Sequence, residues 1–317
     1  MSVGAVSSGG DFKGFEPADF DAYQQKKWGS NAYTLERRRA KDRLLALARA
    51  AAKDLDQALD GLELSGSDEA PSMANGRKVS AQLAYFCRVA SERAALKTLL
   101  QKTDLASGAS LFDIAQEHQH LIVYLRLDQA GLSVGLALAG KARVDRDNAA
   151  KKLREKWARD KLVELCRSLP FGSTIGPEGE RLDALALQEP ALEPWVEVFE
   201  KSDRAFAVEV QVPRTEEILA AEALIGTVTD HLEAFLPVYR FLAWSRENDV
   251  SHVKEAIQVQ KKKIEDRKAY EAGDRVTILS GLFAGRGGYV SEVAKGKVKV
   301  MIGPVAVTVD VKDLKPN

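Results

Sequence analysis

Short runs of alternating apolar residues, separated by glycine-rich turns, fill the C-terminal end of the chain. The first run, which contains Val276, leads into the glycine-rich stretch 281–288. The second run, which contains Val290, follows that stretch. Two further runs occupy residues 297–302 and 305–309. Short runs of this kind, joined by glycine turns, are the pattern of half-buried strands in a small sheet. The sequence therefore predicts a small β-barrel over residues 271–317.

The same segment resembles a KOW motif, the element found in NusG-type transcription factors and in several large-subunit ribosomal proteins. The glycine positions of that motif match Gly281, Gly285 and Gly288, and its apolar positions match Val276, Val290 and Val298. Residues 303–314 resemble the closing strands of the NusG-type version. The resemblance implies an SH3-like barrel that binds RNA in some proteins and protein in others.

The turn between the first two runs has two readings. Leu282 and Phe283 are apolar residues in a turn, and Arg286 brings a planar donor suited to phosphate or carboxylate. Such a loop either meets a partner, by stacking on a base or filling a protein pocket, or folds back over the end of the barrel. In the simpler interpretation Gly281, Gly285 and Gly288 serve only the architecture.

The remaining chain reads as an α+β body. Apolar alternation over residues 120–140, interrupted by a turn at 128–131, predicts an antiparallel hairpin with one strongly apolar face. A strand is also expected at 205–212, and residues 79–89 fit a strand or a helix, of which we favour the strand. Helices are expected at 34–59, 92–101, 147–169, 193–201 and 215–236, with Pro237 as a break or a kink. Ser91 is expected to cap the helix at 92–101. The apolar stripe of the helix at 34–59 is expected to consist of Leu35, Leu44, Leu45, Ala48 and Leu55. We therefore predict a mainly antiparallel sheet covered by helices.

These patterns divide the chain into a disordered lead at 1–14, the body at 15–248, a helical connector at 249–270 and the barrel. The body weakly resembles bacterial domains of unknown function. This resemblance rests on the segment at residues 15–20 and on the order of helices and strands. The connector reads as a semi-rigid spacer, too short for a convincing coiled coil.

Composition indicates a soluble globular protein: of 317 residues, 45% are hydrophobic and 29% charged. No apolar run approaches the ~20 residues of a membrane span, and the N-terminus lacks the features of a secretory signal. Two isolated cysteines, Cys87 and Cys166, fit a reducing compartment, so we expect a cytoplasmic protein.

Basic residues are concentrated on two of the expected helices, although the formal net charge is zero. Residues 36–53 carry seven basic side chains against two acidic ones, and residues 141–161 carry nine against four. The first helix supplies a candidate basic patch for nucleic acid or ribosome, made of Arg37, Arg38, Arg39 and Arg43. The alternative is an ordinary solvated helix face.

Catalytic patterns are sparse. His118 and His120, with Asp113 and Glu117 nearby, resemble a metal-ligand set, but two histidines beside a loop are more often surface residues. We assign no metal, no cofactor and no catalytic residue. The leading hypothesis is a non-enzymatic adaptor that docks through the barrel on RNA, a ribosomal protein or a transcription factor. The alternatives are an enzyme or ligand-binding body targeted by the barrel, and a protein that self-associates.

Overall fold

The computed structural model describes residues 11–316 apart from residues 56, 74, 103–115, 246, 250–269 and 295–296. The chain forms two compact units, Met1–Ser251 and His252–Asn317. In the described ranges, no helix has both the length and the apolar character needed to cross a membrane. Residues 1–10 of the lead expected at 1–14, and residues 250–269 of the connector expected at 249–270, lie outside those ranges.

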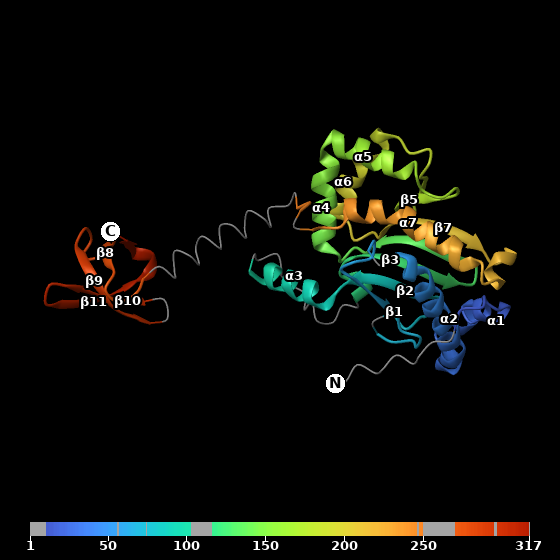
Figure 1. Cartoon of the computed structure of the whole chain (residues 1–317), viewed down its shortest axis with the longest axis horizontal. Helices are drawn as coiled ribbons and strands as arrows, with labels where there is room; N and C mark the ends of the chain where they lie inside the picture. Colours follow the sequence, from blue (N-terminus) through green and yellow to red (C-terminus); the bar gives the residue numbers. More distant parts are fainter. Residues whose placement is uncertain are drawn as a thin grey trace. The chain divides into compact units, whose positions relative to one another are not determined.

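A seven-stranded sheet forms the centre of the first unit, in the order β1-β2-β3-β4-β7-β5-β6 (Figure 1). Every neighbouring pair is antiparallel, which confirms the α+β prediction of a mainly antiparallel sheet. The strands are β1 Leu62–Gly66, β2 Ala81–Arg88, β3 Leu121–Asp128, β4 Gly131–Leu138, β5 Thr174–Pro177, β6 Leu182–Asp183 and β7 Phe206–Pro213.

The predicted hairpin is formed by β3 and β4. Its turn is closed by the Asp128 carboxylate, which accepts hydrogen bonds from the backbone N–H groups of Ala130 at 2.7 Å and Gly131 at 3.2 Å. The prediction of a single apolar face is incomplete, because Ile122 and Tyr124 on the opposite face are also buried. A hairpin in the middle of a sheet is covered on both sides, and its alternation alone cannot reveal this.

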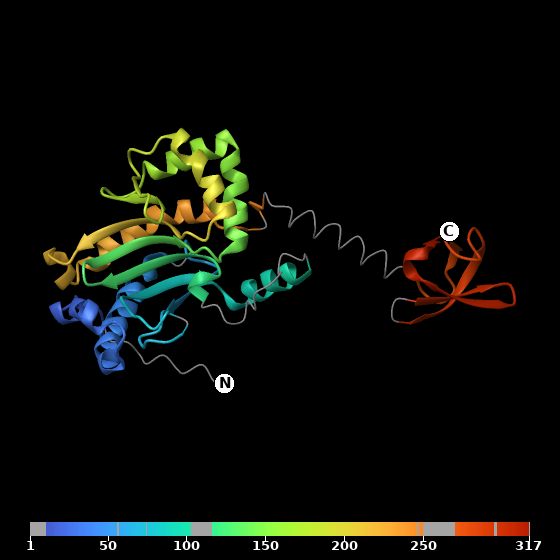
Figure 2. The same cartoon turned by 180° about the vertical axis from the view of Figure 1, so that it is seen from behind.

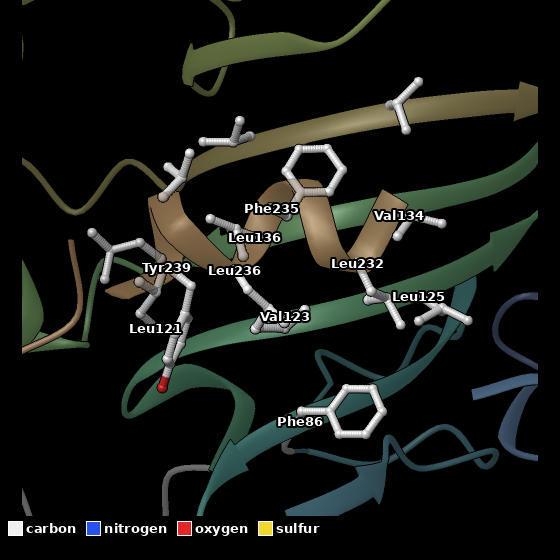
Figure 3. Packing of buried hydrophobic residues seen from close by; sticks show 14 of the residues in the cluster. Phe86, Leu121, Val123, Leu125, Val134, Leu136, Leu232, Phe235, Leu236 and Tyr239 are labelled. Carbon is white, nitrogen blue, oxygen red and sulfur yellow. The ribbon is translucent and has the colours of Figure 1, made fainter. Parts of the chain in front are cut away.

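Helices α2 and α7 cover one face of this sheet. Figure 3 shows Leu232, Phe235 and Leu236 of α7 lying against Val123 and Leu136 of the hairpin. Each such side chain, once fully buried, contributes roughly 1.5–3 kcal/mol relative to leaving it in water. The helices are α1 Pro17–Asp21, α2 Thr34–Ala52, α3 Ala90–Lys102, α4 Arg143–Arg154, α5 Lys156–Cys166, α6 Glu193–Lys201 and α7 Leu224–Leu242. Helices α4, α5 and α6 gather into one group in both views (Figures 1 and 2).

Three helix predictions were wrong in their boundaries. The helix expected at 34–59 ends at Ala52 and is followed by a short 3-10 turn, Lys53–Leu55. The helix expected at 147–169 is two helices, because Glu155 adopts an extended conformation between α4 and α5. The helix expected to start near Thr215 starts at Leu224 and continues through Pro237. A proline inside a helix removes one hydrogen bond, but Leu236 and Val238 on either side of it are buried, and this packing offsets the loss.

Two single-residue expectations also need correction. Leu35 is 59% exposed and does not belong to the apolar stripe of α2, whereas Leu44 and Ala48 are fully buried. Ser91 does not precede α3 as a cap, because the helix already begins at Ala90. Both positions lie in the first turn of a helix, where sequence locates boundaries least well.

The C-terminal end of α7 is capped by side chains. A helix leaves its last carbonyl groups without partners inside the helix, and burial makes such groups costly. Here α4 supplies Lys152, which donates to the carbonyl of Phe241 at 2.5 Å, and Asn148, which donates to that of Leu242 at 3.4 Å. The side chain of Asn248 donates to the carbonyls of Arg240 at 2.9 Å and Ala243 at 2.8 Å.

A buried ion pair completes this end of the helix. Arg88 of β2 binds both carboxylate oxygens of Asp145 of α4, at 2.6 and 3.0 Å, and also donates to the carbonyl of Trp244 at 2.8 Å. Asp145 further accepts from the backbone N–H groups of Leu121 at 2.7 Å and Trp244 at 2.8 Å. Burial opposes the charged form of Asp145, but Arg88 outweighs it and lowers the pKa of the carboxyl group.

We expect the single changes Arg88→Met and Asp145→Asn each to lower the free energy of unfolding by about 3–5 kcal/mol, because each leaves one buried charge without its partner. The double variant should lose less than the sum of the two, because no charge then remains buried. Urea unfolding of the four proteins gives the comparison. Purely additive losses would show that the two groups do not act as a pair.

The second unit is a five-stranded antiparallel sheet that curls into a half-barrel, in the order β11-β10-β9-β8-β12. The strands are β8 Arg275–Ile278, β9 Gly287–Ala294, β10 Lys297–Ile302, β11 Val305–Asp310 and β12 Leu314–Pro316. The register shifts between Lys299 and Val300, where an irregularity lets the sheet bend. This arrangement is consistent with an SH3-like barrel.

Tyr270 belongs to the core of this unit. It is 7% exposed, packs with Val276 and Leu314, and donates its hydroxyl to the carbonyl of Leu314 at 2.9 Å. The sequence instead predicts that residue 270 belongs to the connector. Its ring contributes a large share of the apolar area in so small a core.

We expect a fragment of residues 252–317 to fold alone and unfold cooperatively. In that fragment Tyr270→Ala should lower the free energy of unfolding by about 3 kcal/mol, because it empties a site in the core. Tyr289→Ala provides the matched control, since Tyr289 is half exposed. Tyr289→Ala should lower the free energy of unfolding by no more than about 1 kcal/mol. Circular dichroism during urea titration measures both, and a disordered spectrum for the wild-type fragment would refute its independence.

Candidate functional site

The loop between β8 and β9 is held by its own backbone. Its hydrogen bonds run from the N–H of Gly285 to the carbonyl of Ile278 at 2.7 Å and from the N–H of Ala284 to that of Gly281 at 3.1 Å. Gly281 and Gly285 have φ angles of +82° and +81°, a conformation that glycine adopts without strain. The loop therefore has a defined shape, set by glycines at both ends.

The two apolar side chains of this loop have different environments. Phe283 is half-buried and packs against the core of the half-barrel. Leu282 is fully exposed, at 101%, and Leu279 beside the loop is 53% exposed. Arg286 is exposed as well. Phe283 thus anchors the loop to the half-barrel, while Leu282 presents an uncovered apolar tip to solvent.

Gly288 is required by the packing of the sheet. A Cβ atom built at this residue would lie 2.5 Å from the carbonyl oxygen of Met301 and 2.6 Å from a methyl group of Val300. No side chain fits at such distances without moving the neighbouring strand. The role of Gly288 is therefore architectural, as the simpler interpretation of the glycines expected.

The outer face of the half-barrel carries charges of both signs. Lys297 stands opposite Asp310 on β11, and Lys299 stands opposite Glu292 on β9. The guanidinium of Arg275 lies over the ring of Tyr289, 5.3 Å from its centre. Opposite charges on facing residues reduce the attraction of this face for a polyanion.

The basic patch expected on α2 is not a continuous exposed surface. Arg37 is fully buried and donates to the backbone carbonyls of Glu69 at 2.9 Å, Lys27 at 2.6 Å and Ser30 at 2.8 Å. Burial lowers the pKa of its guanidinium, although the group stays charged. Arg37 therefore fastens α2 to the preceding loops, and it cannot reach a phosphate in this arrangement.

The other members of the patch face solvent to different degrees. Arg38 forms an ion pair with Glu69 at 2.9 Å, and Arg43 forms ion pairs with Asp19 at 2.6 Å and Glu16 at 2.5 Å. Arg39 is exposed. Because two of these arginines already have carboxylate partners, a phosphate would have to displace those carboxylates.

The two histidines considered for a metal site, His118 and His120, lie in different environments. His120 is buried, with its Nδ1 3.0 Å from a guanidinium nitrogen of Arg88. Arginine only donates, so Nδ1 must accept and the imidazole is neutral with its proton on Nε2. Glu117 accepts instead from the hydroxyl of Tyr85 at 3.0 Å, and Asp113 lies outside the described ranges. Among the residues that the structure describes, no group of three or more metal-ligating side chains occurs.

The polar cluster around Arg88 and Asp145 is not predictable from the sequence. The two residues are 57 positions apart and belong to a strand and a helix whose packing no local pattern specifies. The same holds for two cavities near the end of α7. The smaller, about 170 Å³, is lined in part by Arg88, Tyr239 and Trp244. The larger, about 410 Å³, is lined in part by Lys152 and Trp157.

No protein-family model matches the sequence, and no curated protein matches it significantly. The resemblance of the C-terminal residues to a KOW motif therefore rests on those residues and on the shape of the half-barrel alone.

The buried histidine predicts an acid-sensitive fold. Burial, reinforced by Arg88, lowers the pKa of His120 to about 4, from an ordinary value near 6.5. The unfolded chain thus binds a proton more readily, and the stability present above about pH 6.5 is lost as the pH falls towards 4. The full effect of a shift of this size is about 3 kcal/mol.

In the variant His120→Asn, the side-chain oxygen can replace Nδ1 as the acceptor from Arg88, but the side chain does not titrate. We expect the free energy of unfolding of His120→Asn to fall less than that of the wild type between pH 6.5 and 4. His118→Asn, in a more exposed position, should follow the wild-type curve and serves as the control. Parallel curves for wild type and His120→Asn would contradict the assignment.

Proposed function

We propose that this protein is a non-enzymatic adaptor that docks through the loop between β8 and β9 onto a component of the transcription or translation machinery. The observation that carries the proposal is the fully exposed Leu282 at the tip of a loop with a fixed shape. A large apolar side chain held in water gains free energy when a partner covers it. A loop that is already ordered loses little entropy on binding, which favours its use in recognition.

The chemistry of this surface favours a protein partner over RNA. Leu279 and Leu282 form an apolar tip, and an exposed leucine fits an apolar pocket better than a phosphate backbone. Lys297 and Lys299 on the outer face each stand opposite a carboxylate, which weakens the attraction of these lysines for RNA. Arg286 can add a polar contact at the rim of such an interface. The KOW resemblance supports a ribosomal protein or a transcription factor as the partner.

The change Leu282→Ser in the full chain tests the proposal. Because the side chain is exposed, the melting temperature should change little, whereas binding should weaken on the order of thirtyfold if the leucine fills a pocket. Leu35→Ser is the matched control, since Leu35 is an exposed leucine of the first unit. Recovery of ribosomal or polymerase components on the tagged protein, quantified by mass spectrometry, gives the readout.

Nuclease treatment and Phe283→Ala separate the remaining outcomes. Partners that survive nuclease are bound through protein, and partners that disappear were bound through RNA. Phe283→Ala should lower the stability of the half-barrel as well as binding, because its ring packs on the core. The proposal fails if Leu282→Ser recovers the same ribosomal or polymerase components as the wild type, or if the wild type recovers none.

A further inference from the structure

Lys152 is a buried cation without a counter-ion. Its side chain comes from α4, and the residue is 5% exposed. The ammonium donates to the carbonyl of Phe241 at 2.5 Å and lies over the Phe241 ring, 4.8 Å from its centre. In the described part of the chain, no carboxylate lies within ion-pair distance of it. Burial alone lowers the pKa of this lysine to about 8.

Capping of α7 explains only part of this arrangement. An ammonium group has more donors than the carbonyl of Phe241 can satisfy, and a buried cation is usually paired with an anion. Other buried cations of the same unit are more fully bonded: Arg88 pairs with Asp145, and Arg37 donates to three backbone carbonyls. Lys152 thus retains hydrogen-bonding capacity, and its charge meets the Phe241 ring and the carbonyl end of α7 rather than a carboxylate.

The larger cavity lies beside this group. It measures about 410 Å³, within the size range of small-molecule sites, and is lined by Lys152, Trp157, Lys161, Arg240, Phe241, Glu247, Asn248 and Asp249. Trp157 on α5 is 59% exposed, which is unusual for so large an apolar side chain. Lys152 and the exposed Trp157 therefore line the same cavity.

The charged groups around the cavity do not supply the missing anion. Lys161 forms its ion pair with Glu164 at 3.0 Å, and Arg240 donates to the carbonyl of Ala58 at 2.9 Å. Glu247 and Asp249 each take part in other interactions. Neither carboxylate raises the pKa of Lys152, whose shift has burial as its only cause.

We propose that this cavity binds a small planar anion, with the carboxylate or other acidic group on the ammonium of Lys152 and the ring system against Trp157. A charge-assisted hydrogen bond in a partly buried site is strong, and it would complete the donors of the lysine. The indole of Trp157 offers the flat apolar face that an aromatic ring covers. This site belongs to the first unit and is independent of the proposed docking loop.

Isothermal titration calorimetry of the full chain with 2-naphthoate tests the proposal. Naphthalene-2-carboxamide has nearly the same shape but no charge, and we expect it to bind at least about tenfold more weakly. Lys152→Met should weaken binding of 2-naphthoate by a similar factor. Trp157→Ala should weaken the binding of both compounds. Because Trp157 is exposed, the variant should remain folded.

Lys156→Met is the matched control. Lys156 lies on the same helix as Trp157, is exposed, and pairs with Asp160 at 2.9 Å outside the lining of the cavity. The Lys156→Met variant should bind 2-naphthoate as tightly as the wild type. Three results would overturn the proposal: no binding of 2-naphthoate at about millimolar concentration, equal affinity for the acid and the amide, or unchanged binding in Trp157→Ala.

Discussion

The buried ion pair of Arg88 and Asp145 is the interaction on which the first unit depends most. Removing two charges from water is costly, and the cost is recovered only when the geometry is good and every remaining donor and acceptor is satisfied. Asp145 meets that condition with four hydrogen bonds, two of them from backbone N–H groups. The pair therefore links the central sheet, α4 and the end of α7 through directional bonds, in addition to their apolar contacts.

The sequence predicts the elements that periodicity defines and misses those that tertiary contacts decide. The hairpin of β3 and β4 follows from strict alternation around a turn, and the half-barrel follows from short strands and glycines. The break at Glu155 and the continuity of α7 through Pro237 do not, because local preference favours the opposite outcome at each residue. At Pro237, the packing of the buried neighbours Leu236 and Val238 overrides the local preference.

The candidate sites show the same division. The turn with Leu282 and Phe283 stands out in sequence as apolar residues between glycines, yet only the structure separates the exposed side chain from the one that packs inward. A run of arginines reads as a surface patch, but Arg37 is interior because three carbonyl groups surround it. The environment of Lys152 leaves no trace in sequence, since its cavity is built from helices far apart along the chain.

The capped end of α7 is also the place where the chain leaves the first unit. Beyond Trp244 and Asn248 the polypeptide continues towards the half-barrel, so any tension applied through the second unit reaches the first unit there. The backbone N–H of Trp244 donates to Asp145, and its carbonyl accepts from Arg88. The three preceding backbone carbonyls accept from Lys152, Asn148 and Asn248. A force applied to the chain beyond Asn248 would therefore load these bonds before it could unwind α7.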